Sequence, residues 1–232
     1  MRARKVFTNR KGGVSAAPYE SFNLGDHVGD SPQSVAANRE RLSSVLGLPG
    51  IVWMEQLHTN HVTVVSKADI GHTIEATDAL ITTDPMTPLA VMVADCVPVL
   101  LSSDTVVAAV HAGRMGARNG ILRTTIEAMK DLGAGPIHCL MGPAICGSHY
   151  EVPASMAMDV ENHLPGSACR TAKGTQGLDL RRGLAVQFLE SSGSELLDVN
   201  WTCTYEDRDY FSYRRSRQTG RQAGLVWLEP EA

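Results

Sequence analysis

The chain has 232 residues, of which 43% are hydrophobic and 20% are charged, and its net charge at pH 7 is −4. This length favours one domain over residues 1–232 with a substantial core, and the hydrophobic content excludes a disordered tail or a collagen-like repeat. The acidic balance excludes a protein that binds nucleic acid with its whole surface. No apolar segment has the length of a membrane span, so we expect a cytoplasmic protein that binds neither nucleic acid nor a membrane.

The first clear element in the chain is a helix that begins at Ser31-Pro32, where serine is a capping residue and proline fits the first helical position. We expect it to end at Gly47. Its buried face is expected to consist of Val35, Leu42, Val45 and Leu46. Short apolar segments typical of strands follow at 51–54, 61–65, 79–82, 89–93, 97–101 and 106–110. The last three are almost continuously apolar, which indicates strands that are buried on both faces.

The second half of the chain contains further helices and strands. A helix is predicted over 119–132, closed by Gly133, with an inward face of Ile121, Leu122, Thr125, Ile126 and Met129. Other helices are predicted near 155–163 and 180–191, and strands near 137–141, 197–200 and 225–228. Together these elements predict a single α/β domain with a mixed sheet.

Three reactive side chains lie where predicted buried strands end. His58 lies between two predicted strands, Cys96 interrupts a long apolar segment, and His111 directly follows a predicted strand. Catalytic groups commonly lie on loops at strand ends, so these three residues are the candidate catalytic set. His61 would point away from His58 on a strand, so it ranks below His58 as a ligand.

Two kinds of chemistry suit one cysteine and two histidines. As metal ligands they would leave a fourth position open to water or substrate, which is the arrangement of catalytic zinc sites. Without a metal, a histidine would deprotonate Cys96 for nucleophilic attack. The ordinary alternative is a core cysteine with two hydrogen-bonded histidines. Asp95 favours a functional site, because a carboxylate in an apolar segment needs a partner.

The chain has five cysteines and no Cys-x-x-Cys pair. The odd number and the spacing argue against a disulfide framework and against a four-thiolate zinc site. Cys146 and His149 are three residues apart, and this spacing alone is too weak to predict a second metal site.

Seven motifs occur in a characteristic order. They are Asn-Leu-Gly at 23–25, Gln-Leu-His at 56–58, Asp-Ala-Leu-Ile-Thr at 78–82, Ala-Asp-Cys-Val-Pro-Val at 94–99, His-Ala-Gly at 111–113, Gly-Pro-Ala-Ile at 142–145 and Phe-Ser-Tyr-Arg-Arg at 211–215. In this order they resemble the YfiH-type, laccase-domain purine nucleoside phosphorylases, which are also called polyphenol oxidase family proteins. The resemblance extends over nearly the whole chain.

The resemblance implies a layered α/β sandwich with mixed sheets, in which His58, Cys96 and His111 are the catalytic residues and bind a zinc ion (Zn²⁺). Copper (Cu²⁺) is the alternative metal. It also implies phosphorolysis of adenosine, inosine and methylthioadenosine to the base and ribose 1-phosphate, with adenosine deamination as a further activity. The expected partners are purine nucleosides and phosphate, bound by a monomer or a small homo-oligomer.

One motif departs from the family pattern. The family usually has His-Ala-Gly-Trp-Arg-Gly, whereas this chain has Arg114 and Met115 in place of the tryptophan and the arginine. If the family's arginine binds an anion, its loss would affect substrate range and rate more than metal binding. Arg114 or Arg118 is the candidate replacement.

Phosphorolysis needs a cationic pocket for phosphate, and residues 208–221 contain five arginines and one acid. The predicted substrate-binding cations are Arg214, Arg215 and Arg221, with Arg217 between them. Aromatic residues in the same segment favour a binding site over a solvated basic surface. Asn23 is predicted to hydrogen-bond ribose or base. Asp95 is predicted at the substrate site, where it would orient a ligand histidine or pair with an arginine.

Three other functions stay open at this point. A copper-dependent polyphenol oxidase would need many histidines, commonly in close pairs, whereas the chain has 8 and no His-x-His pair. A metal-free Cys–His hydrolase or amidase would use Cys96 as its nucleophile. A non-catalytic nucleotide-binding module would keep the fold while Met115 blunts the activity.

Overall fold

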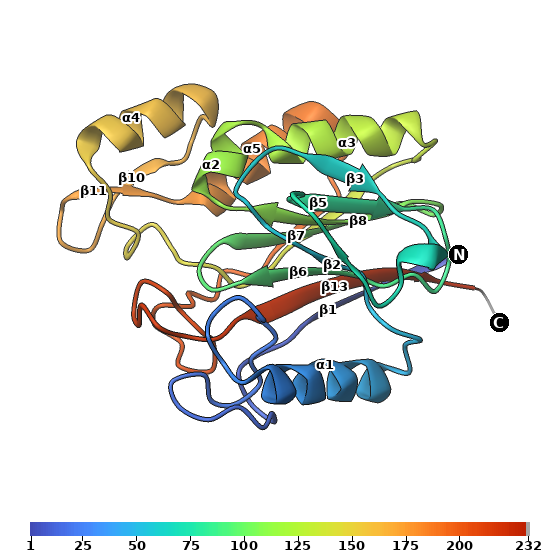
Figure 1. Cartoon of the computed structure of the whole chain (residues 1–232). Helices are drawn as coiled ribbons and strands as arrows, with labels where there is room; N and C mark the ends of the chain where they lie inside the picture. The colour runs from blue at the N-terminus through green and yellow to red at the C-terminus, as the bar shows by residue number, and fades with distance from the viewer. Residues whose placement is uncertain (231–232) are drawn as a thin grey trace.

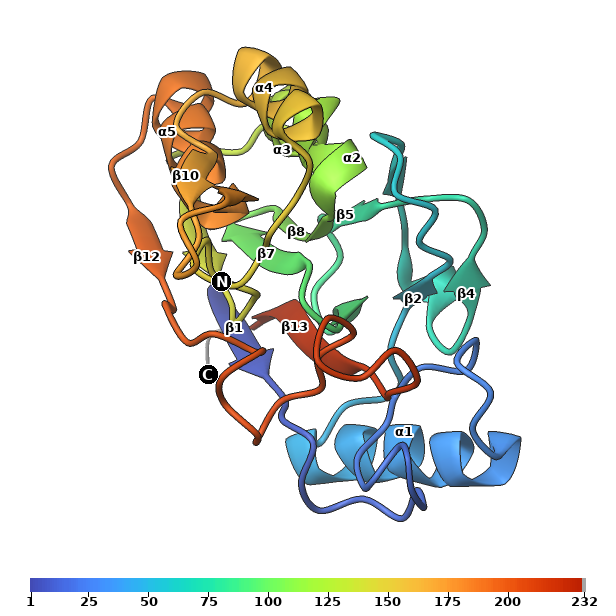
Figure 2. The ribbon, with the colours of Figure 1, turned by 90° about the vertical axis from the view of Figure 1, so that its left-hand side faces the viewer.

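The computed structural model describes residues 1–230, and its helices and sheets are stacked in layers (Figure 1). A group of helices covers a six-stranded sheet, a three-stranded sheet lies against the other face of that sheet, and a single helix covers the outer face of the three-stranded sheet (Figure 2). The predicted layered α/β sandwich with mixed sheets is confirmed. The predicted domain extends to residue 232, and its last two residues lie outside the described ones.

The six-stranded sheet is mixed. In spatial order its strands are β12 (Leu197–Val199), β9 (His138–Met141), β7 (Val97–Ser102), β8 (Val107–Ala112), β5 (Ala79–Thr82) and β3 (Val62–Val64). The two outermost pairs are parallel and the three inner pairs are antiparallel. Strand β8 continues past the predicted end at residue 110, so His111 lies within it, opposite Pro98 of β7.

The other sheets are smaller. The three-stranded sheet is antiparallel and consists of β1 (Arg2–Phe7), β13 (Gln222–Glu229) and β6 (Leu89–Val93). The two remaining pairs are β2 (Trp53–Met54) with β4 (Thr73–Ile74) and β10 (Ala168–Arg170) with β11 (Gln176–Leu178). Because β1 pairs with β13, the two ends of the described chain lie in one sheet.

The helices are α1 (Pro32–Leu46), α2 (Arg114–Arg118), α3 (Ile121–Asp131), α4 (Ala154–His163), α5 (Leu180–Ser192) and the short 3-10 helix η1 (Lys67–Asp69). Helices α2 to α5 lie over the six-stranded sheet, and α1 lies under the three-stranded sheet (Figures 1 and 2). Among the described residues, none of these helices combines the length and the apolar character that crossing a membrane requires.

Alternation along the buried strands divides the core into layers. In β8, Val107 and Ala109 pack between the two large sheets, whereas Ala108 and Val110 pack beneath the helices. Strand β6 alternates in the same way between the inter-sheet layer and the layer that faces α1. Both faces of each strand are therefore apolar, which is the physical basis of their continuous apolar sequences.

Helix α1 has the predicted ends. Ser31 accepts a hydrogen bond from the backbone of Ser34, and Gly47 ends the helix at φ 64°, a conformation that favours glycine. The prediction that Val45 lies on the buried face is wrong, because its side chain is 75% exposed. Asn38 is buried instead, since its amide donates to the backbone oxygens of the loop beneath the helix, including that of Asn23 at 2.9 Å.

The later helices also follow the sequence pattern. All five residues predicted on the inward face of α3 are buried. Helices α4 and α5 and strands β9, β12 and β13 occur where they were predicted, within a few residues. Strands β1, β4, β10 and β11 and helix α2 were not predicted, because they are short or carry many polar residues.

Candidate active site

The structure brings His58, Cys96 and His111 together from three separate segments. His58 lies in the loop after β2, Cys96 in the β6–β7 loop and His111 in β8. One ligand atom of each side chain lies within 4.8 Å of the others. The two imidazole rings meet edge to face, with their centroids 4.7 Å apart. A cysteine and two histidines therefore face a common point.

The buried carboxylate of Asp78 positions both histidines. It accepts hydrogen bonds from Nδ1 of His111 at 2.7 Å and from the backbone N–H groups of His58 at 3.0 Å and Thr59 at 2.7 Å. Burial would raise the pKa of Asp78, but the hydrogen bonds from His111 and Thr59 outweigh burial and lower it to about 2. Because this ionised acceptor binds Nδ1, Nε2 is the ring nitrogen of His111 that is available to a ligand.

Sequence reasoning did not assign this role to Asp78. The residue is 33 positions from His111 in the chain, and their contact depends on the pairing of β5 with β8. Its one sequence signal is a carboxylate directly before a buried apolar strand, since a charge at such a position needs partners.

The charges in the site suit both chemistries that the sequence left open. Partial burial of the ring lowers the pKa of His58, and the nearby His111 lowers it further, which favours the neutral ring that binds a metal. Burial also lowers the pKa of His111, but Cys96 and Asp78 outweigh burial and raise it to about 9. Without a metal, His111 would lie between Cys96 and Asp78, in the order of nucleophile, histidine and carboxylate found in a catalytic triad.

The backbone around the three residues is unusual. His58 and Asp95 have φ values of 60° and 97°, which residues other than glycine rarely adopt. Gly113 follows β8 and has no side chain, and a Cβ atom built there would clash with Nδ1 of His58 and lie 3.2 Å from Sγ of Cys96. Such constrained positions are common at functional sites.

A pocket of about 710 Å³ opens over His58, Cys96 and His111, a volume within the usual range for small-molecule sites. Its lining includes four arginines and two tyrosines: Arg114, Arg214, Arg217, Arg221, Tyr150 and Tyr213. The positive charge and the aromatic rings suit a ligand that combines an anion with a flat, polar ring.

Three of the predicted substrate residues, Asp95, Arg214 and Arg221, line this pocket. The Arg214 guanidinium lies over the ring of Tyr150, 5.0 Å from its centroid. The Asp95 carboxylate accepts hydrogen bonds from the backbone N–H of Arg214 at 2.6 Å and from Oγ1 of Thr204 at 2.7 Å. The hydrogen bonds of Asp95 therefore run to the segment that carries Arg214, whereas Asp78 is the carboxylate that contacts His111.

Arg215 lies outside the residues that line the pocket. Its guanidinium donates hydrogen bonds to the backbone oxygens of Thr204 at 2.6 Å and Tyr205 at 3.0 Å, and also to Tyr210. The structure thus uses this side chain to hold the loop around residues 204–215. The same backbone runs on to Arg217 and Arg221, which do line the pocket.

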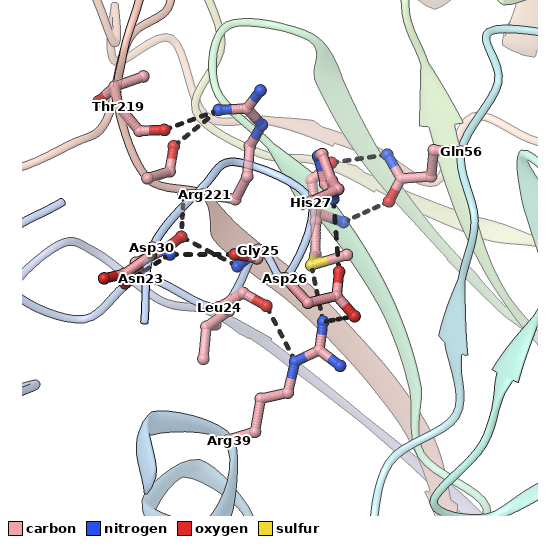
Figure 3. Close-up of polar contacts among 12 residues, drawn as sticks. Asn23, Leu24, Gly25, Asp26, His27, Asp30, Arg39, Gln56, Thr219 and Arg221 are labelled. Atoms are coloured by element: carbon pink, nitrogen blue, oxygen red, sulfur yellow. Dashed lines mark hydrogen bonds and ion pairs between the residues drawn. The ribbon is translucent and has the colours of Figure 1, made fainter. Parts of the chain in front are cut away.

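Asn23 is fully buried beneath Arg221 (Figure 3). Its side-chain oxygen accepts hydrogen bonds from the backbone N–H of Arg221 at 2.8 Å and of Gly25 at 2.9 Å, and its amide donates to Asp30 at 2.9 Å. Arg221 itself lines the pocket, and its guanidinium donates to the backbone oxygens of Thr219 and Gly220. Asn23 therefore positions the backbone of Arg221 from below the pocket.

The residues of the divergent motif both reach the pocket. Arg114 and Met115 are the first two residues of helix α2, and both line the pocket. Arg118 makes two hydrogen bonds to Asp159, at 2.6 Å and 2.8 Å, and lies outside the lining. Of the two arginines considered as replacements, Arg114 is therefore the one whose charge reaches the pocket.

The donor set fits a metal ion. A thiol and two imidazoles are ligands that zinc and copper accept, and three ligands leave one position for substrate. The hydrogen bond from His111 to Asp78 is the partner that metal-bound histidines usually have. His58, Cys96 and His111 would hold the ion.

Comparison with known proteins identifies the family. The sequence profile of the family described as multi-copper polyphenol oxidoreductase laccase matches residues 4–229. The chain belongs to this family. Among its relatives in the laccase family, a purine nucleoside phosphorylase of Corynebacterium glutamicum is 61% identical over 99% of this chain and 96% of its own length. A purine nucleoside phosphorylase of Mycobacterium tuberculosis is 51% identical over 99% of this chain and 93% of its own length.

The fold agrees with this assignment. The crystal structure of the Bacillus licheniformis hypothetical protein YfiH superposes with a TM-score of 0.91 at 28% identity, and covers 98% of this chain and 93% of that one. The predicted resemblance to the YfiH-type family is confirmed. The description of the family refers to a multi-copper oxidoreductase, whereas the relatives named above are called purine nucleoside phosphorylases. The residues that line the pocket help to choose between these two activities.

Proposed function

We propose that the protein is a zinc-dependent purine nucleoside phosphorylase. Its substrates would be adenosine, inosine and methylthioadenosine together with phosphate, and adenosine deamination would be a further activity. The observation that carries the proposal is the set of four arginines around the His58–Cys96–His111 group. The phosphorylase names of close relatives support it.

The pocket arginines match the needs of phosphorolysis. A phosphate oxygen forms a bond to C1′ of the ribose, the bond from C1′ to the purine nitrogen breaks, and its electron pair leaves with the base, which gains a proton. Arg114, Arg214 and Arg221 would bind the phosphate and orient it, because guanidinium groups donate paired hydrogen bonds to such anions. The rings of Tyr150 and Tyr213 would contact the purine.

The three ligand residues would hold the zinc ion at the base of the pocket. A bound zinc ion supplies Lewis-acid polarisation of an oxygen atom of the substrate or water. Asp78 fixes the ring of His111 through Nδ1, and Gly113 leaves space for the ring of His58. This arrangement keeps the ligand side chains oriented before the substrate arrives.

A copper oxidase is the second candidate. One cysteine with two histidines is also the ligand set of mononuclear blue-copper sites, which supports that alternative. A multi-copper enzyme needs several further histidines. Among the described residues, the other group of potential ligands contains a single histidine, His149. The oxidation of a phenol would also not require the four pocket arginines, so we favour the phosphorylase.

The test is to incubate the purified protein with adenosine, with and without phosphate, and to measure adenine, ribose 1-phosphate and inosine by chromatography. We expect adenine and ribose 1-phosphate only when phosphate is present, and inosine in both reactions. Cys96→Ala should lose both activities, and the copper-loaded protein should not oxidise phenols. Phenol oxidation in the absence of nucleoside turnover would contradict the proposed phosphorylase activity and support an oxidase.

A further inference from the structure

A second group of metal-binding residues lies in two short turns outside the Cys96 site. The turns are Cys146-Gly147-Ser148-His149 and Cys203-Thr204-Tyr205-Glu206, and each places a cysteine three residues before another potential ligand. In each turn the cysteine carbonyl accepts a hydrogen bond from the backbone N–H of that second residue, at 3.0 Å for His149 and 3.2 Å for Glu206. The two turns therefore have the same local geometry.

Backbone pairing holds the two turns side by side. Ala144 and Cys203 form a parallel β-bridge, and the backbone N–H of Thr204 donates to the oxygen of Ala144 at 3.2 Å. The N–H of Cys146 donates to Sγ of Cys203 at 3.3 Å. N–H donors to sulfur are the kind of contact that supports a metal-bound thiolate.

The ligand atoms have the spacing of a tetrahedral zinc site. Zinc bonds of about 2.3 Å to sulfur and about 2.0–2.2 Å to nitrogen or oxygen place tetrahedral ligand atoms roughly 3.3–3.8 Å apart. Nδ1 of His149 lies 3.3 Å from Sγ of Cys146, 3.8 Å from Sγ of Cys203 and 3.6 Å from Oε1 of Glu206. All four ligand atoms lie within 4.8 Å of one another.

Neighbouring groups fix the histidine ring and place a cation near the two turns. The His149 ring stacks on Tyr205, with centroids 4.7 Å apart and an angle of 20° between the planes. Arg181 is fully buried, and its guanidinium donates hydrogen bonds to the backbone oxygens of Asn200 and Thr202, just before Cys203. A buried guanidinium at this position favours negative charge on the nearby cysteines, and it also interacts with the Asp179 carboxylate.

We propose that Cys146, His149, Cys203 and Glu206 form a second metal site, which binds a structural zinc ion. Four protein ligands close the coordination sphere, as in structural sites, whereas the His58–Cys96–His111 group leaves a position open. The four residues come from two parts of the chain that only the fold brings together.

The bound zinc ion would brace one side of the active-site pocket. Ile145 precedes Cys146 and Tyr150 follows His149, and both line the pocket. On the other turn, Thr204 follows Cys203 and hydrogen-bonds Asp95. A metal that joins the turns would thus hold together the segments on which Tyr150 and Asp95 depend.

Zinc stoichiometry of the reduced, purified chain tests the proposal. We expect about two zinc ions per chain in the wild type, and about one in each of Cys96→Ala, Cys146→Ser and His149→Ala. Cys169→Ser is the matched control, because Cys169 is a half-exposed cysteine near the same loop but outside the ligand group, and it should keep both ions.

Cobalt substitution of the Cys96→Ala protein gives a second measurement that requires no change in the proposed site. Its Co²⁺ form should show thiolate-to-cobalt charge-transfer absorption, since two thiolates remain. A Cys96→Ala protein that binds neither zinc nor cobalt would overturn the proposal. So would a native Cys146–Cys203 disulfide, detected as a loss of two hydrogen atoms in the intact mass. If the Cys96 site instead fails to bind zinc, the wild type would hold one ion that survives Cys96→Ala and is lost in Cys146→Ser.

Discussion

The carboxylate of Asp78 joins two parts of the candidate active site. It binds the ring of His111 and the backbone of the loop that carries His58, so it constrains both imidazoles from one buried position. Partners of this kind determine how strongly a histidine binds its metal, because they fix the tautomer and the direction of the ring.

Replacing Asp78 by asparagine should weaken zinc binding at the Cys96 site by about 10–100-fold, because a neutral amide holds the His111 ring less firmly. Competition with a chromophoric chelator, carried out in the Cys146→Ser background, measures this affinity. Asp104→Asn, at an exposed position, is the matched control and should leave the affinity unchanged. Equal affinities in the two variants would show that Asp78 does not support the site.

Arg114 supplies a charge to the pocket where the family's usual arginine is replaced by Met115. Arg114→Ala should raise the KM for phosphate by about 10–100-fold, which corresponds to a hydrogen bond to a charged group worth about 1.5–3 kcal/mol. Arg118→Ala is the matched control. It removes a guanidinium from the same helix, but this guanidinium binds Asp159, so we expect little change in the KM for phosphate. Steady-state kinetics at varied phosphate concentrations measure the KM of both variants. Similar KM values in Arg114→Ala and Arg118→Ala would show that Arg114 does not bind phosphate.

The turn between β8 and α2 leaves no room for a side chain beside His58 and Cys96. Gly113 lies there against His58 and Cys96, so even one methyl group would displace the ring of His58. The ring belongs to an exposed loop residue, so it can move without unfolding the protein.

Gly113→Ala should therefore lose zinc from the Cys96 site and lose activity, while keeping its circular dichroism spectrum. Gly135→Ala is the matched control, because a Cβ atom there would meet no atom within 4 Å, and it should behave as the wild type. Full zinc content and activity in Gly113→Ala would mean that the close approach seen between Gly113 and His58 is unimportant.

The sequence predicted elements best where burial dominates. Strands β5 and β6 have the predicted bounds, because the apolar segments that encode them are buried on both faces. The polar strand β1 was missed, since its position depends on pairing with β13 at the other end of the chain. Helix α2 was missed because its five residues lack an apolar period.

The candidate site was predictable only in part, for a related reason. His58, Cys96 and His111 carry chemistry that the sequence displays, and the fold brings them together. Asp78 and the group around Cys203 depend on contacts between distant segments. The segment 208–221 was visible as a cationic cluster, but only the fold distinguishes Arg214 and Arg221 in the pocket from Arg215, which binds backbone oxygens.

Across the whole molecule, charge is unevenly distributed. The chain is acidic overall, yet four arginines line one pocket above the Cys96 site. These arginines come from α2 and from the segment before β13, which are distant in the sequence but line the same pocket. A protein with a net charge of −4 can therefore attract a phosphate ion locally.

The proposed structural zinc ion should contribute to the stability of the whole chain. In Cys96→Ala, chelation should lower the melting temperature by about 10 °C, since a ligand at roughly 1,000 times its Kd stabilises by about 4 kcal/mol. Thermal unfolding with and without chelator measures this shift. The double variant Cys96→Ala/Cys146→Ser should show no shift on chelation, and a shift of equal size there would place the stabilising ion elsewhere.

The decisive measurement is the formation of ribose 1-phosphate from adenosine and phosphate by metal-free protein to which zinc is returned. We predict no product from the metal-free wild type and full recovery with zinc. We predict no recovery in Cys96→Ala, which retains the ligands of the second site. Ribose 1-phosphate formation that is undiminished in the metal-free protein or in Cys96→Ala would contradict a zinc-dependent phosphorylase centred on His58, Cys96 and His111.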